Sequence, residues 1–206
     1  MCCPNKEIRF DDFILTIGED VYEPAEDSML FAENLHVKKG STVLDMGTGC
    51  GILAIVAAKK ASNVLAIDVS PHAVRCAKQN ATVNRLAERI GFLRTDLFSG
   101  LAGERRFDLI LFNAPYLPCN VSDESSWLDK AWAGGCEGRE VIDRFMKDVS
   151  GHLKPRGEIL LMQSSLSDCE KSINNLALQG LSTGVVAKRR LPFFEELCLI
   201  RAQASS

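Results

Sequence analysis

The chain has 206 residues, of which 46% are hydrophobic and 25% are charged, so it is long enough and apolar enough to bury a full core. Its formal net charge of −3 argues against a surface dedicated to nucleic acid, and no apolar run approaches the ~20 residues of a membrane span. The N-terminus has no apolar signal core, so we expect a cytoplasmic protein of one domain, with residues 1–40 as an extension and covering helix and residues 41–206 as the main body.

The eight cysteines form no Cys-x-x-Cys pair and no cluster with histidine. We therefore expect no metal site, and reduced thiols that act mostly as small buried hydrophobes. The sequence assigns no role to Cys2 and Cys3.

The first 40 residues predict two elements. An apolar patch at residues 13–17 indicates a short strand or a covering segment. Pro24 fits the first turn of a helix that runs to about Val37 and ends at Gly40. Around the start of this helix lie side chains that are more polar than a cover requires: Tyr22, Glu23 and Asp27.

Residues 41–51 are the stretch around which the rest is organised. An apolar run from Thr42 to Leu44 predicts a buried strand, and it is followed by Asp45 and by three alternating glycines, Gly47, Gly49 and Gly51. Residues 52–60 predict a helix. A strand, a glycine turn and a helix N-terminus bring backbone N–H groups close to a ligand. The acidic residue before the glycines favours a ligand with hydroxyls or an ammonium group, such as S-adenosyl-L-methionine (SAM), although a turn that only packs helix on strand remains open.

Acidic residues follow two further strands. Residues 63–69 predict a buried strand that ends at Asp68, and Ser70 with Pro71 predicts the start of a helix that runs to about residue 84. A third strand at residues 90–93 precedes Asp96. Because ligands of open α/β sheets bind outside the carboxyl ends of the strands, three acids at three consecutive strand ends indicate one pocket, with Asp68 placed for ribose hydroxyls.

The fourth strand, residues 107–112, leads directly into Asn113-Ala-Pro-Tyr116. Pro115 forces Ala114 into an extended conformation, which turns the Asn113 side chain toward the top of the sheet. A carboxamide, a fixed carbonyl and the Tyr116 ring favour a site that holds a planar –NH2 group, whereas the simpler interpretation is a proline turn.

The last third of the chain predicts a closing part of the sheet. Residues 119–137 predict a long polar loop that carries both tryptophans, and a helix with a buried apolar face follows from about residue 140. A fifth strand is expected at residues 157–162, and Ser167-Asp-Cys-Glu170 is typical of a capping box. Residues 183–191 and 196–202 predict an antiparallel pair.

This strand–helix alternation resembles the Rossmann-like class I SAM-dependent methyltransferase fold, an α/β fold with a seven-stranded, mostly parallel sheet, helices on both faces and a closing antiparallel hairpin. Asn113-Ala-Pro-Tyr116 resembles the Asn-Pro-Pro-Tyr motif of enzymes that methylate planar nitrogens. Residues 21–28 (Val-Tyr-Glu-Pro-Ala-Glu-Asp-Ser) and residues 132–145 closely resemble the archaeal and eukaryotic branch of the HemK-type glutamine methyltransferases. Those enzymes modify the Gly-Gly-Gln motif of class I peptide chain release factors.

The resemblance implies SAM as cofactor and a role for each matching residue. Asp45 and Gly47 would line the methionine part of SAM, with Ser28 near its carboxylate, and Asp68 would hold the ribose. The same pocket would include Tyr22, Gly49 and Gly51, with Asp96 and Leu97 at the adenine. The catalytic segment would be Asn113, Ala114, Pro115 and Tyr116, where Ala114 replaces the usual proline.

The predicted reaction is transfer of the SAM methyl group to a glutamine side chain of a class I release factor, with the Asn113 side-chain oxygen and the Ala114 carbonyl binding the two amide N–H groups. In this family a small zinc-binding activator pairs along a sheet edge, which would be the third strand here, at Ile90 and Phe92. Three alternatives remain: a nucleic-acid methyltransferase acting on adenine N6 or guanine N2, another protein methyltransferase, and a non-catalytic SAM-binding subunit.

Overall fold

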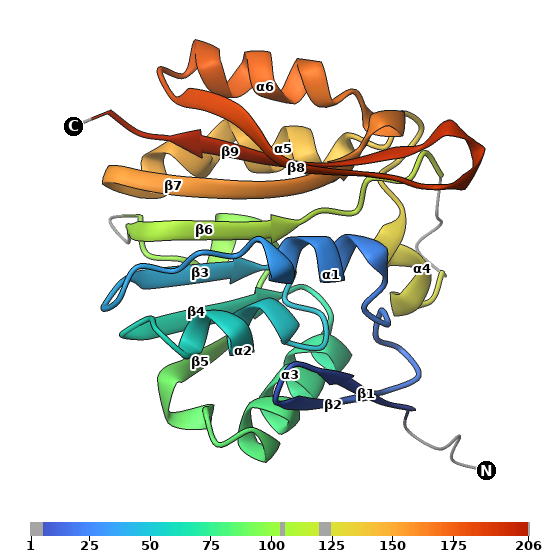
Figure 1. The fold of residues 1–206 in the computed structure, drawn as a ribbon, viewed down its shortest axis with the longest axis vertical. Helices are drawn as coiled ribbons and strands as arrows, with labels where there is room; N and C mark the ends of the chain where they lie inside the picture. Colours follow the sequence, from blue (N-terminus) through green and yellow to red (C-terminus); the bar gives the residue numbers. More distant parts are fainter. Residues whose placement is uncertain (1–5, 104–105, 120–124, 206) are drawn as a thin grey trace.

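The computed structural model describes residues 6–103, 106–119 and 125–205 (Figure 1). Cys2 and Cys3 therefore lie outside the described residues, as do five residues of the predicted polar loop, 120–124. Within the described ranges, no helix is both long enough and apolar enough to cross a membrane.

A seven-stranded sheet forms the centre of the molecule, with the strand order β5-β4-β3-β6-β7-β9-β8. Strands β3 to β7 pair in parallel, and β9 runs antiparallel to both β7 and β8. The prediction of a mostly parallel sheet closed by an antiparallel pair is confirmed. The strands are β3 (Thr42–Met46), β4 (Asn63–Asp68), β5 (Ile90–Arg94), β6 (Phe107–Asn113), β7 (Leu153–Ser164), β8 (Ser182–Arg190) and β9 (Glu196–Gln203).

Helices cover both faces of this sheet, and Figure 1 shows α1 and α2 in front of it and α5 behind it. The inner strands are buried on both sides, which is why they carry apolar runs, Val43-Leu44 in β3 and Leu109–Phe112 in β6. On the α5 side, the rings of Phe112 and Phe145 pack with their centroids 4.6 Å apart. The helices are α1 (Glu26–Glu33), α2 (Ile52–Ala58), α3 (Pro71–Val83), α4 (Trp127–Trp132), α5 (Glu140–Asp148) and α6 (Cys169–Leu178). Short 3-10 turns occupy η1 (Ala87–Arg89), η2 (Leu97–Gly100), η3 (Val149–His152), η4 (Ser165–Ser167) and η5 (Pro192–Phe194).

A separate hairpin of β1 (Lys6–Phe10) and β2 (Phe13–Ile17) packs on α3. The sequence predicted β2 but not β1. Two asparagines of α3 bind the backbone of β2: Asn84 exchanges hydrogen bonds with Ile14 at 3.1 and 2.8 Å, and Asn80 exchanges them with Thr16 at 2.8 and 3.1 Å. Asn80 also donates to the carbonyl of Cys50 in the glycine turn, at 2.9 Å. The hairpin is therefore fixed to the turn that the sequence singled out.

Several predicted boundaries are wrong for local reasons. Helix α1 ends at Glu33 rather than near Val37, because the Asn34 side chain donates to the Leu30 carbonyl at 2.8 Å and so takes the acceptor that would continue the helix. The predicted polar loop contains α4, which begins with a capping box between Ser126 and Asp129.

Two further boundaries differ at the end of the sheet. Helix α6 is capped by Asp168, which accepts from Lys171 N at 3.0 Å, whereas the Ser167 hydroxyl donates to Ser164. Strand β7 extends beyond the expected residues 157–162 at both ends, since it pairs with β6 on one side and β9 on the other. By contrast, the predicted cap of α3 is confirmed, because the Ser70 side chain accepts from the backbone and Pro71 occupies the first turn.

Candidate active site

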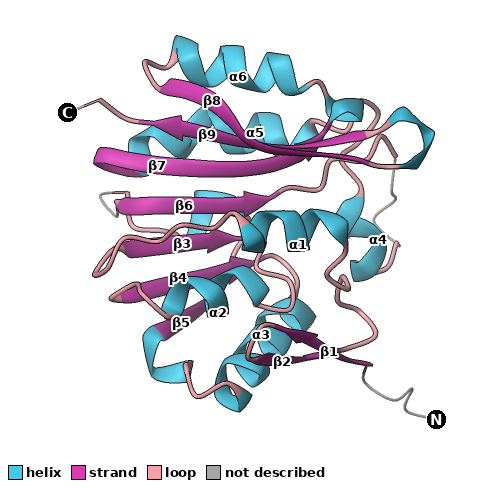
Figure 2. Cartoon of the chain, viewed as in Figure 1, coloured by secondary structure: helices cyan, strands magenta, loops and turns pink. Residues whose placement is uncertain are grey.

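A cavity of about 920 Å³ opens at the carboxyl ends of β3, β4 and β6, the edge of the sheet at which Figure 2 shows α4. Its size suits a nucleoside-sized ligand together with a substrate side chain. Most of the predicted site residues line it. They are Tyr22, Ser28, Gly47, Gly49, Asp68, Asp96, Leu97, Asn113, Ala114, Pro115 and Tyr116.

Asp68 and the glycine turn form one wall of this cavity. The Asp68 carboxylate accepts from Gly49 N at 3.0 Å and from Ser70 N at 2.9 Å, one bond on each oxygen. Burial raises the pKa of Asp68 above its ordinary value, and these backbone hydrogen bonds oppose the shift. Gly49 has φ +55°, and a Cβ at this position would meet no atom within 4 Å. The turn therefore leaves open space in front of a carboxylate whose oxygens each retain a lone pair for a hydroxyl.

Asp45 and Gly51 do not line the cavity, in contrast to the expectation from the resemblance. The Asp45 carboxylate is 1% exposed and accepts from the Thr48 hydroxyl at 2.6 Å and from Ala54 N at 3.0 Å. It therefore holds the glycine turn to the first turn of α2. Gly51 has φ +88°, and its Cβ position lies 3.0 Å from the backbone of Ala77, so this glycine allows α2 and α3 to approach closely.

Asp27 connects the residues on the opposite wall. This carboxylate is 5% exposed. One oxygen accepts from Ser28 N at 2.6 Å, from the Ser28 hydroxyl at 3.2 Å and from the Tyr22 hydroxyl at 3.2 Å. The other accepts from Asn113 Nδ2 at 3.1 Å and from the Tyr116 hydroxyl at 3.2 Å. The sequence marks Asp27 as unusually polar but assigns it no role, because two of its partners, Asn113 and Tyr116, lie more than 80 residues away.

The Asn113 carboxamide is fixed by these contacts in one orientation. Its Nδ2 donates to Asp27 and, at 3.2 Å, to the Ser28 hydroxyl. Its Oδ1 is buried and has no hydrogen-bond partner among the described residues. A buried acceptor without a donor is costly, so a ligand N–H group that reaches Oδ1 would be stabilised there.

The two tyrosines keep their protons in this environment. Burial, followed by the charge of Asp27, raises the pKa of both Tyr22 and Tyr116. Both phenols therefore act as hydrogen-bond donors to Asp27 rather than as bases.

The segment that follows α4 supports the Asn113–Tyr116 loop from behind. Leu117 N donates to the Trp132 carbonyl at 3.1 Å, and Gly134 N donates to the Leu117 carbonyl at 2.8 Å. Gly138 has φ +68°, and a Cβ there would lie 2.2 Å from the Tyr116 carbonyl oxygen. The glycines of residues 134–138 are therefore required for the loop to pack this closely.

Asp96 and Leu97 lie at the far end of the cavity, where the Asp96 carboxylate forms an ion pair with Arg144 of α5 at 2.5 Å. The side chains of Asp96 and Arg144 are each 48% exposed. Arg144 was not predicted as a site residue, and no signal in its own helix singles it out. The pair leaves the rim of the cavity polar at this end.

Comparison with known proteins identifies the family of this chain. The family model of ribosomal protein L11 methyltransferase (PrmA) matches residues 26–114. A putative protein N5-glutamine methyltransferase of Methanocaldococcus jannaschii is 40% identical over 95% of this chain and 98% of its own length. The methyltransferase HEMK2 of Homo sapiens is 31% identical over 88% of this chain and 89% of its own length.

Among solved structures, the chain is similar to one in the E. cuniculi Mtq2–Trm112 complex, which is responsible for methylation of the translation termination factor eRF1. The TM-score is 0.67 at 24% identity, over 90% of this chain and 99% of that one, which shows a shared fold. The two relatives, which match most of its length at 40% and 31% identity, show that the chain belongs to the protein N5-glutamine methyltransferase family.

Proposed function

We propose that this chain transfers a methyl group from SAM to the side-chain nitrogen of the glutamine in the Gly-Gly-Gln motif of a class I peptide chain release factor. The observation that carries the proposal is the buried Asn113 Oδ1, which has no partner among the described residues. A primary amide supplies the N–H group that this acceptor lacks. Family membership, together with similar proteins that act on glutamine and on eRF1, supports the same substrate.

The residues on the Asp68 side of the cavity fit SAM. Asp68 offers lone pairs for the ribose hydroxyls, and Gly49 leaves room for the ligand to approach the backbone. Ser28 lies beside Asn113 and would be close to the methionine end, while Asp96 and Leu97 line the end assigned to adenine. When bound, SAM supplies an electrophilic methyl group on a sulfonium.

On the Asn113 side, the chain positions the nucleophile. An amide nitrogen is a poor nucleophile because its lone pair is delocalised into the carbonyl. Asn113 Oδ1 and the Ala114 carbonyl would accept the two N–H groups of the substrate and aim its nitrogen at the reacting carbon, which is catalysis by positioning. The Asp27 carboxylate lies directly behind Asn113 and favours the positive charge that develops on the nitrogen, which lasts until the methylated nitrogen releases one of its two protons to water.

Ala114 replaces the usual proline without opening the loop. Its side chain is buried, and its N–H group, which a proline would lack, donates to the Met162 carbonyl at 3.4 Å. This bond continues the pairing of β6 with β7 by one residue. This hydrogen bond restrains the loop in place of the proline ring. We therefore expect the Ala114 carbonyl to keep its position as an acceptor.

The proposal is tested by incubating the protein with labelled SAM and a release factor, in parallel with the Gly-Gly-Ala variant of that factor and with bulk RNA and DNA. We expect label only in the Gly-Gly-Gln factor. Asn113→Ala should abolish turnover while SAM binding, measured by calorimetry, stays mostly intact. Turnover by Asn113→Ala, or transfer to nucleic acid instead of protein, would contradict the proposal.

We also propose that a small zinc-binding activator subunit pairs with β5. In support, β5 is an edge strand of the sheet, as predicted, and the E. cuniculi relative is a complex with Trm112. The side chains differ from expectation, because Ile90 is buried and Phe92 is half-buried, so the partner would bind chiefly the free backbone of the edge. Full activity and monodispersity of the chain alone would refute this.

A further inference from the structure

The tip of the β8–β9 hairpin, residues 191–195, carries an apolar feature that the site does not explain. Phe193 and Phe194 are 97% and 104% exposed, the two highest values among the exposed large hydrophobic residues. Both have positive φ, at 60° and 65°, a backbone region that bulky side chains rarely adopt. Leu191 N donates to the Glu195 carbonyl at 2.8 Å, which closes the loop and keeps both rings outside it.

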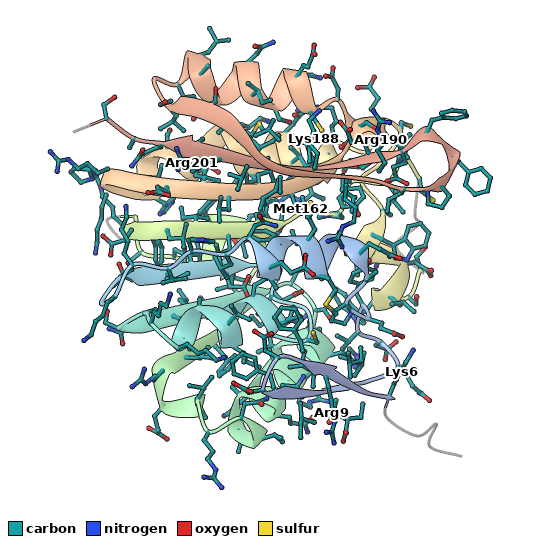
Figure 3. The ribbon with its side chains drawn as sticks, viewed as in Figure 1. Lys6, Arg9, Met162, Lys188, Arg190 and Arg201 are labelled. Carbon is teal, nitrogen blue, oxygen red and sulfur yellow. The ribbon has the colours of Figure 1, made fainter. Side chains whose placement is uncertain are left out.

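Strand register places this tip at the same edge as the cavity. Asn113 pairs with Met162 of β7, Met162 pairs with Leu199 of β9, and Leu199 pairs with Ala187 of β8. This row crosses the sheet at the level of the carboxamide. Because β9 runs antiparallel to β7, the hairpin tip lies beyond the row on the side where the parallel strands end. Figure 3 shows Lys188 and Arg190 on the arm leading to the tip, with Arg201 at the opposite end.

Arg189 connects the arm that leads to the tip with the wall that holds Asn113. Arg189, just before the tip, donates to the Glu26 carbonyl at 3.3 Å and forms an ion pair with Glu33 at 2.8 Å, so β8 is fixed to the helix that carries Asp27. The charge of Glu195, at the tip, is the smallest of the causes that raise the pKa of Tyr116, after burial, Asp27 and Tyr22. The arm that carries the tip is therefore fixed to the helix beside Asn113, while residues 191–195 themselves are not among those that line the cavity.

We propose that Phe193 and Phe194 form a docking finger that inserts into an apolar depression on the protein substrate, beside the loop that presents the glutamine. The inference rests on the proposed function. A glutamine that reaches the Asn113 end of the cavity brings the body of its protein to the same edge of the sheet as this tip. Aromatic residues that project from a rigid loop are typical anchors of protein–protein interfaces.

The test compares a whole release factor with a short peptide that contains its Gly-Gly-Gln loop. The double variant Phe193→Ala/Phe194→Ala should raise KM for the release factor about tenfold or more, as loss of an interface anchor does, while kcat/KM for the peptide changes less than about twofold. Phe193→Leu/Phe194→Leu, which retains apolar area, should recover most of the affinity. Leu178→Ala, at an 86% exposed position of α6, is the matched control and should leave both substrates unaffected.

Four results would overturn the proposal. An unchanged KM for the release factor would show that the rings do not dock on the substrate, and an equal loss with the peptide would assign them to the cavity. Concentration-dependent dimerisation in light scattering, abolished by the double variant, would assign the tip to self-association. Absence of transfer by the unsubstituted protein to either substrate would contradict the proposed function itself, and the docking role with it.

Discussion

Replacement of Asp27 by asparagine tests how the substrate amide is held. The substitution retains shape but gives one oxygen position an –NH2 group. One Asp27 oxygen accepts three hydrogen bonds, one from Tyr22 and two from Ser28, so the amide oxygen of the asparagine will occupy that position. The –NH2 group must then face Asn113 and Tyr116. Two amide nitrogens then oppose each other at about 3.1 Å. The repulsion is relieved when the Asn113 carboxamide rotates, which exchanges the positions of its Oδ1 and Nδ2.

The expected loss follows from that rotation. Removal of one acceptor that a transition state needs costs about 3 kcal/mol, or about 10²-fold in kcat. Loss of hydrogen bonds to a buried carboxylate costs about 1.5–3 kcal/mol each in stability. Single-turnover transfer from labelled SAM measures the first effect and denaturant unfolding the second, while calorimetry should show SAM binding changed less than about threefold.

Asp108 provides the matched control for this experiment. Its carboxylate accepts from Thr42 N, the Thr42 hydroxyl and Lys154 at 2.7–2.8 Å, but at the amino end of β6, away from the cavity. Asp108→Asn should therefore lower stability and leave kcat unaffected. If Asp27→Asn folds and retains kcat within about threefold of the unsubstituted protein, the orientation argument is refuted.

Two further predictions concern stability. Burial raises the pKa of Asp45 to about 7. Between pH 4 and 7 the folded state therefore holds a proton that the unfolded state releases near pH 4. The free energy of unfolding should fall by up to about 4 kcal/mol as the pH rises from 4 to 7. Asp45→Asn should flatten this slope in denaturant titrations at several pH values; an unchanged slope would assign it to other groups. Gly138→Ala should cost about 3 kcal/mol or more, because its Cβ would lie 2.2 Å from the Tyr116 carbonyl oxygen. Gly180→Ala, with φ +82° and no atom within 4 Å, should cost only about 1 kcal/mol, and equal losses would refute the packing argument.

The sequence predicted the sheet well because its signals are local. Apolar runs, alternating glycines and a Ser-Pro cap fix β3, β4 and the start of α3 without help from distant residues. It also predicted which strand ends would meet, since parallel strands end at one edge of a sheet. The polar network of Asp27 could not be predicted, because its geometry depends on contacts between residues more than 80 positions apart.

Residue type alone also misled at Asp45. An acid before a glycine turn suits a ligand and a buried helix contact equally well, and only the structure shows that the carboxylate turns toward Ala54 rather than the cavity. The end of α1 was missed for a related reason. Asn34 reads as an acceptable helix residue until its side chain is seen to bind the Leu30 carbonyl.

Tandem mass spectrometry of a release factor after incubation with the protein and SAM tests the central claim most directly. The account predicts a single added methyl group on the glutamine of the Gly-Gly-Gln motif, located on the side-chain nitrogen, and none when Asn113→Ala replaces the unsubstituted protein. Methylation of a lysine, of a backbone terminus or of a different glutamine would show that the Asn113 carboxamide does not select the amide it is proposed to hold.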